Sequence, residues 1–352
     1  MILSTAHVSL ELLHTFRIAR SADDVRESLL MSLREGDLAG LGEAAPIARY
    51  GQTADSAARA LETIAESLRN SKGKLDRNRI SEIIAPLGEA FAGEKAALAA
   101  VDIALWDLMG KQTGLPIHEI LGLEPSNTPL TSYTIGIDSP RVIRKKVKEA
   151  ESFPILKVKM GLENDYEIME QIRGLTDRTV RVDANEGWTK EEALDKIRWL
   201  EGQNVEFIEQ PLPADRLDEI KWLAEKVSLP FFADESIETI DDIPRLKGAF
   251  SGINIKLMKC GGITEALRLI ESAREQGMMI MLGCTIESSI GITAAAQISP
   301  LVDYADLDGN ILIGNDPAAG VTVERGKLVL PEGPGLGVEL RDDYIMEQLE
   351  IP

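Results

Sequence analysis

Three carboxylates stand at the ends of consecutive apolar runs in the middle of the chain. Asp183, Glu209 and Asp234 each lie at or next to the end of such a run. If the runs are neighbouring parallel strands, their carboxyl ends meet at one edge of the sheet, and the three side chains converge. Carboxylates cannot gather in a site of low dielectric constant unless a cation neutralises them. Because oxygen ligands without histidine or cysteine suit a hard cation, the pattern predicts Mg²⁺ here, with Mn²⁺ as the alternative ion.

Three lysines on two other runs could move a proton near that ion. Lys157 and Lys159 are two residues apart, so both point to the same face of a strand. Two buried ammonium groups with a metal ion nearby are expected to have lowered pKa values, towards a neutral amine. Lys256 lies four runs further on, which in a closed ring of eight strands is the opposite side. Lys159 and Lys256 are therefore predicted to face each other over the metal, with Lys157 assisting.

A metal ion with a base on each side is suited to inverting a carbon atom next to a carboxylate. The ion stabilises the enolate that forms when the α-proton leaves. One lysine can remove the proton from one face while the other returns a proton to the opposite face. Such a 1,1-proton transfer is racemisation or epimerisation, and β-elimination is the closely related alternative.

These residues belong to a repeated pattern of short apolar runs, each followed by a helix-like stretch. The runs are about 25 residues apart, long enough for a strand, a loop and a helix. Eight such units predict an α/β fold, a (β/α)8 barrel over residues 126–315. An open doubly wound sheet is the competing arrangement, but eight near-equal units favour closure. The runs are 132–137, 156–160, 180–184, 206–210, 231–235, 253–257, 279–283 and 304–307, with helix patterns over 190–201 and 264–276.

The two ends of the chain lie outside that repeat. Residues 1–125 are predicted to form an α+β unit. Residues 316–352 are rich in Gly and Pro, contain a hairpin pattern over 321–330 and are expected to return to the first unit. The elements expected in the first unit are strands over 1–13 and 25–33, a turn at Gly36-Asp37 into a third strand around Leu41, and helices over 54–70 and 94–111.

The composition excludes several classes of protein. The chain has 352 residues, with 38 Lys and Arg against 58 Asp and Glu, a formal net charge of −20. This charge argues against nucleic acid and against an anionic membrane surface as partners. The two cysteines, Cys260 and Cys284, cannot form a disulfide framework or a cysteine-based zinc site, and they favour a cytoplasmic protein. No apolar run reaches the roughly 18–20 residues that a membrane-spanning helix needs.

At the lysines and acids, the chain resembles the enolase superfamily. Lys157-Val158-Lys159, Lys256 and the three acids resemble its muconate lactonizing enzyme subgroup, whose barrel carries a capping α+β domain. Within that subgroup the chain is similar to the dipeptide epimerases, such as the L-Ala-D/L-Glu epimerases. The resemblance covers nearly the whole chain, and the further stretches that carry it are 42–46, 49–51, 102–107, 254–257, 261–262, 283–284 and 306–309.

Asp306 and Asp308, at the end of the eighth run, form the motif most specific to the dipeptide epimerases. The two side chains are two residues apart and face the same way, which gives a paired anionic site. Such a site suits the α-ammonium group of a dipeptide. The C-terminal carboxylate of the dipeptide would then bind the metal, next to the carbon that is inverted.

The resemblance implies that two loops of the capping unit, residues 15–21 and 46–53, close over the substrate and set its specificity. Arg20 and Arg49 lie in them, and Arg20 is at about the position where the Ala-Glu epimerases carry an arginine for the glutamate side chain. A guanidinium group is the natural partner of a carboxylate. Glu287, after the seventh run, is a further candidate for the pocket and would repel an acidic substrate, so these residues support opposite preferences.

The sequence therefore predicts a Mg²⁺-dependent isomerase, a dipeptide epimerase that inverts the C-terminal residue of Ala-Glu or a similar Ala-Xaa dipeptide from peptidoglycan turnover. The resemblance also implies a homo-oligomer. The alternatives within the subgroup are a muconate cycloisomerase, an o-succinylbenzoate synthase and an N-acylamino acid racemase, whose substrates have no free ammonium group for Asp308 to bind. A non-catalytic barrel that binds a ligand is a further alternative, against which the complete set of lysines and acids argues.

Overall fold

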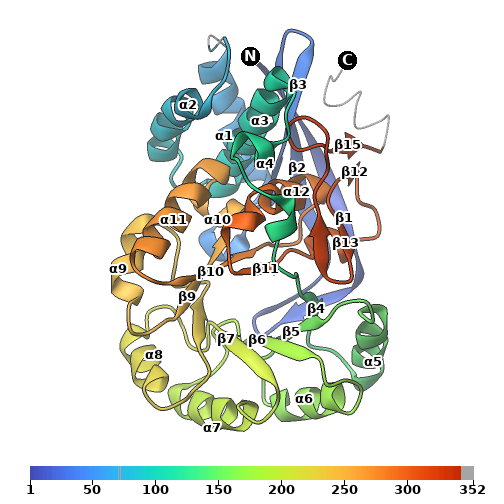
Figure 1. The fold of residues 1–352 in the computed structure, drawn as a ribbon, viewed down its shortest axis with the longest axis vertical. Coiled ribbons are helices and arrows are strands. Elements are labelled where there is room, and N and C mark those ends of the chain that lie inside the picture. The colour runs from blue at the N-terminus through green and yellow to red at the C-terminus, as the bar shows by residue number, and fades with distance from the viewer. Residues whose placement is uncertain (70, 72, 342–352) are drawn as a thin grey trace.

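The structure is a computed structural model that describes residues 1–69, 71 and 73–341. These residues form a parallel barrel, an antiparallel sheet with helices packed on it, and a C-terminal segment (Figure 1). Among the helices in these ranges, none combines the length and the hydropathy needed to cross a bilayer.

The eight predicted runs form the barrel. The strands follow one another in chain order, and an isolated parallel bridge between Thr131, just before the first strand, and Ala305 in the last strand joins the two ends of the sheet. This bridge closes the ring, so the open doubly wound sheet is excluded. The strands are β4 (Tyr133–Ile135), β5 (Ile155–Lys159), β6 (Thr179–Asp183), β7 (Val205–Glu209), β8 (Phe231–Ala233), β9 (Gly252–Lys256), β10 (Met279–Gly283) and β11 (Tyr304–Asp306). Strand β8 is shorter than predicted, so Asp234 directly follows it.

Helices cover the outside of the barrel. In α7, for example, a capping box between Thr189 and Glu192 fixes the first turn, and apolar residues three and four apart are buried against the strands. Helix α12 is buried along its whole length, as its apolar composition requires. The helices are α5 (Pro140–Glu149), α6 (Asp165–Arg173), α7 (Lys190–Leu200), α8 (Leu217–Ala224), α9 (Ile243–Leu246), α10 (Leu257–Cys260), α11 (Ile263–Glu275) and α12 (Ser289–Ile298).

The N-terminal unit has three antiparallel strands and three main helices. They are β1 (Ile2–Ile18), β2 (Ser21–Glu35), β3 (Leu38–Ala44), α1 (Ala54–Leu68), α2 (Arg77–Ala90) and α3 (Lys95–Thr113). Helix α3 approaches β3 closely at Gly40 and Gly42, which have no Cβ atom. A Cβ atom at either position would lie 2.0 Å from a carbonyl oxygen of the helix, so the close approach requires glycine. Asn70, at the end of the predicted first helix, lies outside the described residues.

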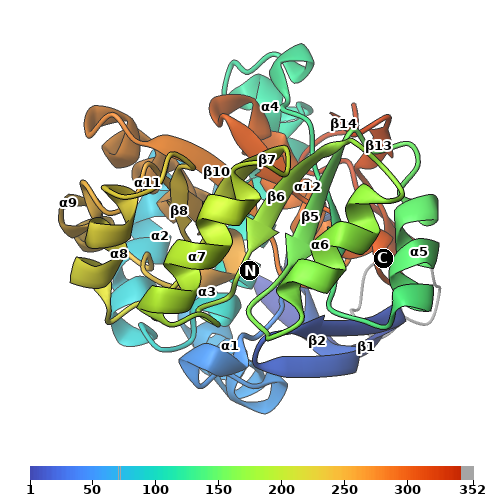
Figure 2. The ribbon, with the colours of Figure 1, turned by 90° about the horizontal axis from the view of Figure 1, so that it is seen from below.

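The first two strands are longer than predicted, and this length positions the site. Their hairpin continues to the turn at residues 19–20, beyond the predicted ends at 13 and 25. Figure 2 shows the hairpin of β1 and β2 extending across one end of the barrel. The turn therefore lies over the ends of the barrel strands.

The C-terminal segment contacts α3. Ile117 N, in the short helix α4 (Ile117–Ile120), donates to Gly335 O at 3.0 Å, and Leu336 N donates to Asp107 of α3 at 2.7 Å. The segment contains β12 (Ala318–Ala319), β13 (Thr322–Glu324), β14 (Lys327–Val329) and β15 (Glu339–Leu340), of which β13 and β14 form the predicted hairpin. Residues 342–352 lie outside the described residues.

Candidate active site

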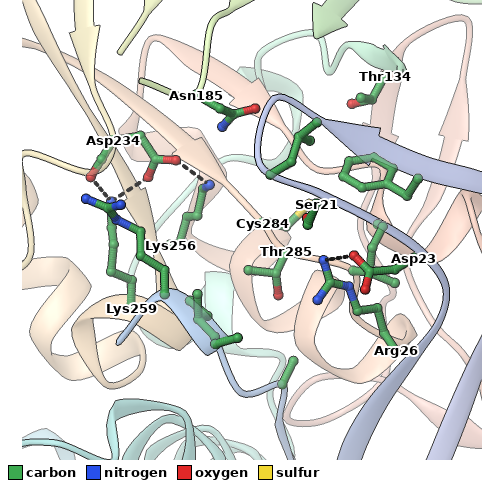
Figure 3. A pocket seen from close by; sticks show the side chains of 18 of the residues that line it. Ser21, Asp23, Arg26, Thr134, Asn185, Asp234, Lys256, Lys259, Cys284 and Thr285 are labelled. Atoms are coloured by element: carbon green, nitrogen blue, oxygen red, sulfur yellow. Dashed lines mark hydrogen bonds and ion pairs between the residues drawn. The ribbon is translucent and has the colours of Figure 1, made fainter. Parts of the chain in front are cut away.

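A cavity of about 580 Å³ lies between the carboxyl ends of the barrel strands and the capping unit. Figure 3 shows it from close by, with Asp234, Lys256 and Lys259 on one side and Asp23 and Arg26 of β2 on the other. Barrel residues that line it include Lys157, Lys159, Asn185, Asp234, Glu235, Lys256, Lys259, Cys284, Thr285, Asp306 and Asp308. The predicted ligands Asp183 and Glu209 are buried and are not among the lining residues. Capping residues that line it include Phe16, Ile18, Arg20, Ile47, Arg49 and Tyr50.

Lys157 joins carboxylates from three strands. Its Nζ lies 2.6 Å from Asp306, 2.7 Å from Glu209 and 3.1 Å from Asp183. Lys159 Nζ donates to Asp183 Oδ2 at 2.6 Å. Strand register explains the grouping, because Lys159, Asp183 and Glu209 are direct partners on β5, β6 and β7.

A second lysine pair holds Asp234. Lys256 Nζ, at the end of β9, donates to Asp234 Oδ2 at 2.7 Å. Lys259 Nζ donates to Asp234 Oδ1 and to the Asp234 carbonyl, both at 2.6 Å, and to Asn254 O at 3.0 Å. Strands β5 and β9 are four apart in the ring, so Lys159 and Lys256 enter the same cavity from opposite sides of the barrel.

Nearby carboxylates raise the pKa values of two lysines, and for Lys157 this is the opposite of the predicted direction. Burial lowers the pKa of Lys157, but Asp306, Glu209 and Asp183 raise it more, to well above its ordinary value. Burial likewise lowers the pKa of Lys256, and Asp234 and Glu209 more than reverse the effect. In these contacts the carboxylates around Lys157 outweigh the repulsion between the ammonium groups of Lys157 and Lys159, on which the predicted lowering depended.

Asp183, Glu209 and Asp234 offer carboxylate oxygens, the ligands that a hard cation binds. Burial and the charge of Asp183 raise the pKa of Glu209 to about 7. Glu209 Oε1 accepts from Asn254 Nδ2 at 2.8 Å, whereas the buried Oε2 accepts no hydrogen bond, although it lies within ion-pair distance of Lys157. Among the residues that the structure describes, no group of three or more acid, histidine or cysteine side chains is arranged so that it could hold a metal ion. The acids contact ammonium groups instead, so metal ligation by Asp183, Glu209 and Asp234 stays a prediction.

The two aspartates of the eighth run differ in their partners. Asp306 Oδ1 accepts from Ser132 Oγ and Oδ2 accepts from Lys157, both at 2.6 Å. Asp308 Oδ2 accepts from Thr134 N at 2.6 Å. Burial and the charge of Asp306 raise the pKa of Asp308 to about 7. Asp306 is thus bound through both oxygens, and Asp308 is the better placed of the two to receive an ammonium group.

Both predicted specificity arginines line the cavity, and both are bound to barrel glutamates. Arg20 Nη2 lies 2.8 Å from Glu235 Oε1, and Arg49 Nη2 donates to Glu186 Oε1 at 2.8 Å. Neither glutamate was identified from the sequence. Glu235 follows the predicted acid Asp234 directly, which was the available signal.

Glu287 is not among the residues that line the cavity. Its Oε1 accepts from Thr285 N at 2.7 Å and Thr285 Oγ1 at 3.0 Å, and the side chain lies beside Glu43. The prediction that Glu287 belongs to the pocket is therefore not supported by its position. Thr285, two residues earlier, takes that place at the cavity wall.

The burial of Glu287 is expected to make the free energy of unfolding depend on pH. Burial and Glu43 raise the pKa of Glu287 to about 8, so the folded protein binds this proton more tightly than the unfolded chain does. The contribution is complete below about pH 4 and is lost as pH rises through about 8. Between about pH 5 and pH 9, we expect the free energy of unfolding of the wild type to fall by about 4 kcal/mol relative to Glu287→Gln. Urea unfolding followed by circular dichroism measures this, and equal pH dependence in the two proteins would contradict it.

Lys259 is a further cavity residue that was not identified from the sequence. It lies three residues after Lys256, in the one-turn helix α10. A helical turn at that point brings residues three apart to one side. The signal was the spacing Lys256-Leu257-Met258-Lys259, which can be used only if a helix is expected directly after the strand.

The chain matches known families over both of its main parts. Residues 142–344 match the enolase C-terminal domain-like family. Residues 3–122 match the mandelate racemase / muconate lactonizing enzyme N-terminal domain. The chain belongs to the mandelate racemase and muconate lactonizing enzyme family of the enolase superfamily. The fold predicted from the resemblance, a (β/α)8 barrel with an N-terminal α+β unit, is therefore confirmed.

Three relatives within this superfamily illustrate the similarity. The chain is 44% identical over 331 residues to the L-Ala-D/L-Glu epimerase of Bacteroides thetaiotaomicron, covering 94% of this chain and 85% of that one. It is 41% identical to the L-Ala-D/L-amino acid epimerase of Pedosphaera parvula, covering 94% and 97%. The dipeptide epimerase from Cytophaga hutchinsonii, solved with Mg and the dipeptide D-Ala-L-Val, has a TM-score of 0.90 at 28% identity, covering 99% and 98%.

Proposed function

We propose that the protein is a Mg²⁺-dependent dipeptide epimerase that inverts the α-carbon of the C-terminal residue of L-Ala-Xaa dipeptides, Ala-Glu among them. The observation that carries the proposal is the pair Lys159 and Lys256, which enter one cavity from opposite sides of the barrel beside strand-end carboxylates. The similarity to epimerases of Ala-Xaa dipeptides supports it.

The two lysines would divide the proton transfer between them. One, as the neutral amine, takes the α-proton from its face of the substrate, and the other, as the ammonium ion, gives a proton to the opposite face. Bound Mg²⁺, held by Asp183, Glu209 and Asp234, would stabilise the negative charge that develops as the α-proton leaves. Lys157, which contacts Asp183 and Glu209, would assist through its positive charge. One C–H bond breaks and one forms, so the substrate changes only in configuration.

Asp308 is proposed to bind the free α-ammonium group of the dipeptide. An ionised hydrogen bond of this kind contributes about 1.5–3 kcal/mol, so Asp308→Asn is expected to lower kcat/KM for free dipeptides by about 10–100-fold. The activity towards N-acetylated dipeptides, which lack the ammonium group, should be low in both proteins and equal. A wild-type protein that turns over N-acylamino acids but no free dipeptide would instead support the N-acylamino acid racemase.

We further propose that the protein acts in the cytoplasm, in peptidoglycan turnover, and as a homo-oligomer. Cys260 and Cys284 are both free thiols, which supports a reducing compartment. The charge of −20 supports a small-molecule substrate and opposes a nucleic-acid or membrane partner.

A further inference from the structure

Asp165, the first residue of α6, accepts hydrogen bonds from three separate segments of the chain. Its side chain is only 3% exposed. Oδ1 accepts from Gly161 N at 3.0 Å and from Leu162 N at 3.1 Å, so the carboxylate binds the loop that follows β5. Oδ2 accepts from Trp188 Nε1 at 2.7 Å and from Lys196 Nζ at 2.8 Å. We call Asp165, Trp188 and Lys196 the Asp165 cluster.

Lys196, on α7, neutralises the buried Asp165 carboxylate. Its side chain is 9% exposed, and its Nζ also donates to Leu162 O at 2.8 Å. The same Nζ lies 5.5 Å from the centre of the Trp188 ring, within the range of a cation–π interaction. A buried ion pair needs further hydrogen bonds on both partners to offset the loss of water, and both have them here. Removing one member of the cluster therefore leaves another buried without a partner.

The loops that the Asp165 cluster joins begin at the ends of two strands of the candidate site. Gly161 follows shortly after Lys159, the last residue of β5, and Trp188 lies in the loop after Asp183, the last residue of β6. Met160 N donates to Asp183 O at 2.9 Å, so the two chains are still paired where they leave the barrel. Movement of either loop is therefore transmitted to the contact between Lys159 and Asp183.

The backbones of these two loops are in direct contact. Gly161 has a φ of 111°, a conformation that favours glycine. A Cβ atom at Gly161 would lie 2.5 Å from Ala184 O, and one at Gly187 would lie 2.5 Å from Gly161 Cα. Because the main chains touch, a shift of the loop after β5 also displaces the loop after β6, and the Asp165 cluster binds both.

We propose that the Asp165 cluster positions Lys159 for proton transfer by locking the loop after β5 to the loop after β6. The three members, all within the described ranges, do not line the cavity, so they act through Lys159 as positioning residues. The inference rests on the proposed function, in which Lys159 removes the α-proton from one face of the substrate only. Since a displacement of about 1 Å can cost 10²-fold in rate, loosening the cluster slows that face more than the other.

The kinetic test compares the removal of the α-proton from the two epimers of one dipeptide in D₂O with Mg²⁺. Lys159→Ala identifies the epimer that depends on Lys159, because that epimer should no longer exchange. Trp188→Phe keeps a ring in place but removes the donor to Asp165. In Trp188→Phe, we expect the initial rate to fall about tenfold more for the epimer that depends on Lys159 than for the one that depends on Lys256. An equal loss for both epimers, or no loss, would overturn the inference, since a shift of Asp183 or a loss of folded protein slows both alike.

A second variant combines Asp165→Asn with Lys196→Met. Removing both charges together leaves no buried ion without its partner, so this protein should fold, and circular dichroism checks that it does. Its asparagine offers one acceptor oxygen in place of two, so the ratio between the epimers should change in the same direction as in Trp188→Phe. A change in the opposite direction would contradict the inference.

Glu192→Gln is the matched control. Glu192 lies on the same helix as Lys196, and its Oε2 accepts from Thr189 N at 2.9 Å in the capping box of α7. Glutamine can make the same capping contact, and the substitution does not touch the Asp165 cluster. The ratio between the epimers should therefore equal that of the wild type.

Hydrogen–deuterium exchange tests the locking of the loops without any substrate. Loss of one hydrogen bond to Asp165 should make the backbone amides of residues 160–164 and 184–189 exchange about 3–10-fold faster in Trp188→Phe, with no change in Glu192→Gln. Unchanged exchange in both loops of Trp188→Phe would overturn the inference. If the wild type epimerises no dipeptide, the proposed function fails, and the exchange experiment still decides whether the Asp165 cluster locks the loops.

Discussion

Replacing either Lys159 or Lys256 by alanine is expected to abolish epimerisation, with a loss of at least about 10³-fold in kcat. General acid–base catalysis contributes about 10²–10⁴-fold for each group, and the inversion needs both. The two residues lie on β5 and β9, four strands apart in the ring, so neither lysine can replace the other.

The two variants should differ in which epimer they deprotonate. The remaining lysine can still remove the α-proton from one epimer and return a solvent deuteron to the same face. Lys159→Ala should therefore exchange the α-proton of one epimer in D₂O, and Lys256→Ala that of the other, without interconverting them. Proton NMR with each pure epimer measures this, and circular dichroism confirms that the variants fold. Full epimerisation by either variant would rule out the two-base mechanism.

The second large effect is expected at the metal ligands. Glu209→Gln retains the shape of the side chain and an acceptor for Asn254, but it removes a negative charge from the proposed ligand set. We expect its affinity for Mg²⁺ to fall by at least about 10²-fold, since Mg²⁺ prefers carboxylate oxygens. Epimerisation should fall in parallel. Isothermal titration with Mg²⁺ measures the affinity separately from activity.

Glu206→Gln is the matched control for that experiment. Glu206 lies on the same strand, β7, but it accepts from Arg181 Nε at 2.8 Å, and its side chain is 32% exposed, whereas that of Glu209 is fully buried. Its Mg²⁺ affinity should equal that of the wild type. Treatment with EDTA should abolish the activity of the wild type, and Mg²⁺ or Mn²⁺ should restore it. Full activity after complete chelation would refute the metal assignment.

The positions of the acids and lysines could be predicted because strand ends in a barrel share one face. Asp183, Glu209 and Lys256 lie at the last residue of their strands, and the regular repeat was sufficient to place them. Their contacts could not be predicted in the same way. Lys157 on β5 reaches Asp306 on β11, which requires the ring to close between β4 and β11, and this contact reverses the expected pKa direction of Lys157.

Elements outside the repeat were less predictable. Helix α2 was not identified, although Ile80, Ile83, Ile84 and Leu87 have helical spacing, since Pro86 interrupts the pattern near its end. The arginine partners depend on where the long β1–β2 hairpin places its turn. That length follows from packing against the barrel and has no local sequence signal. Glu287 lies outside the cavity because the chain turns after β10, which places Thr285 at the wall instead.

The central claim is that this cavity removes and returns the α-proton of a dipeptide's C-terminal residue. Incubating the wild type with Mg²⁺ and individual L,L-dipeptides in D₂O, followed by mass spectrometry and chiral separation, tests it directly. We predict that L-Ala-Xaa dipeptides gain one mass unit at the C-terminal α-carbon and appear as both epimers. Exchange of N-acylamino acids alone, with every free dipeptide unchanged, would contradict the account.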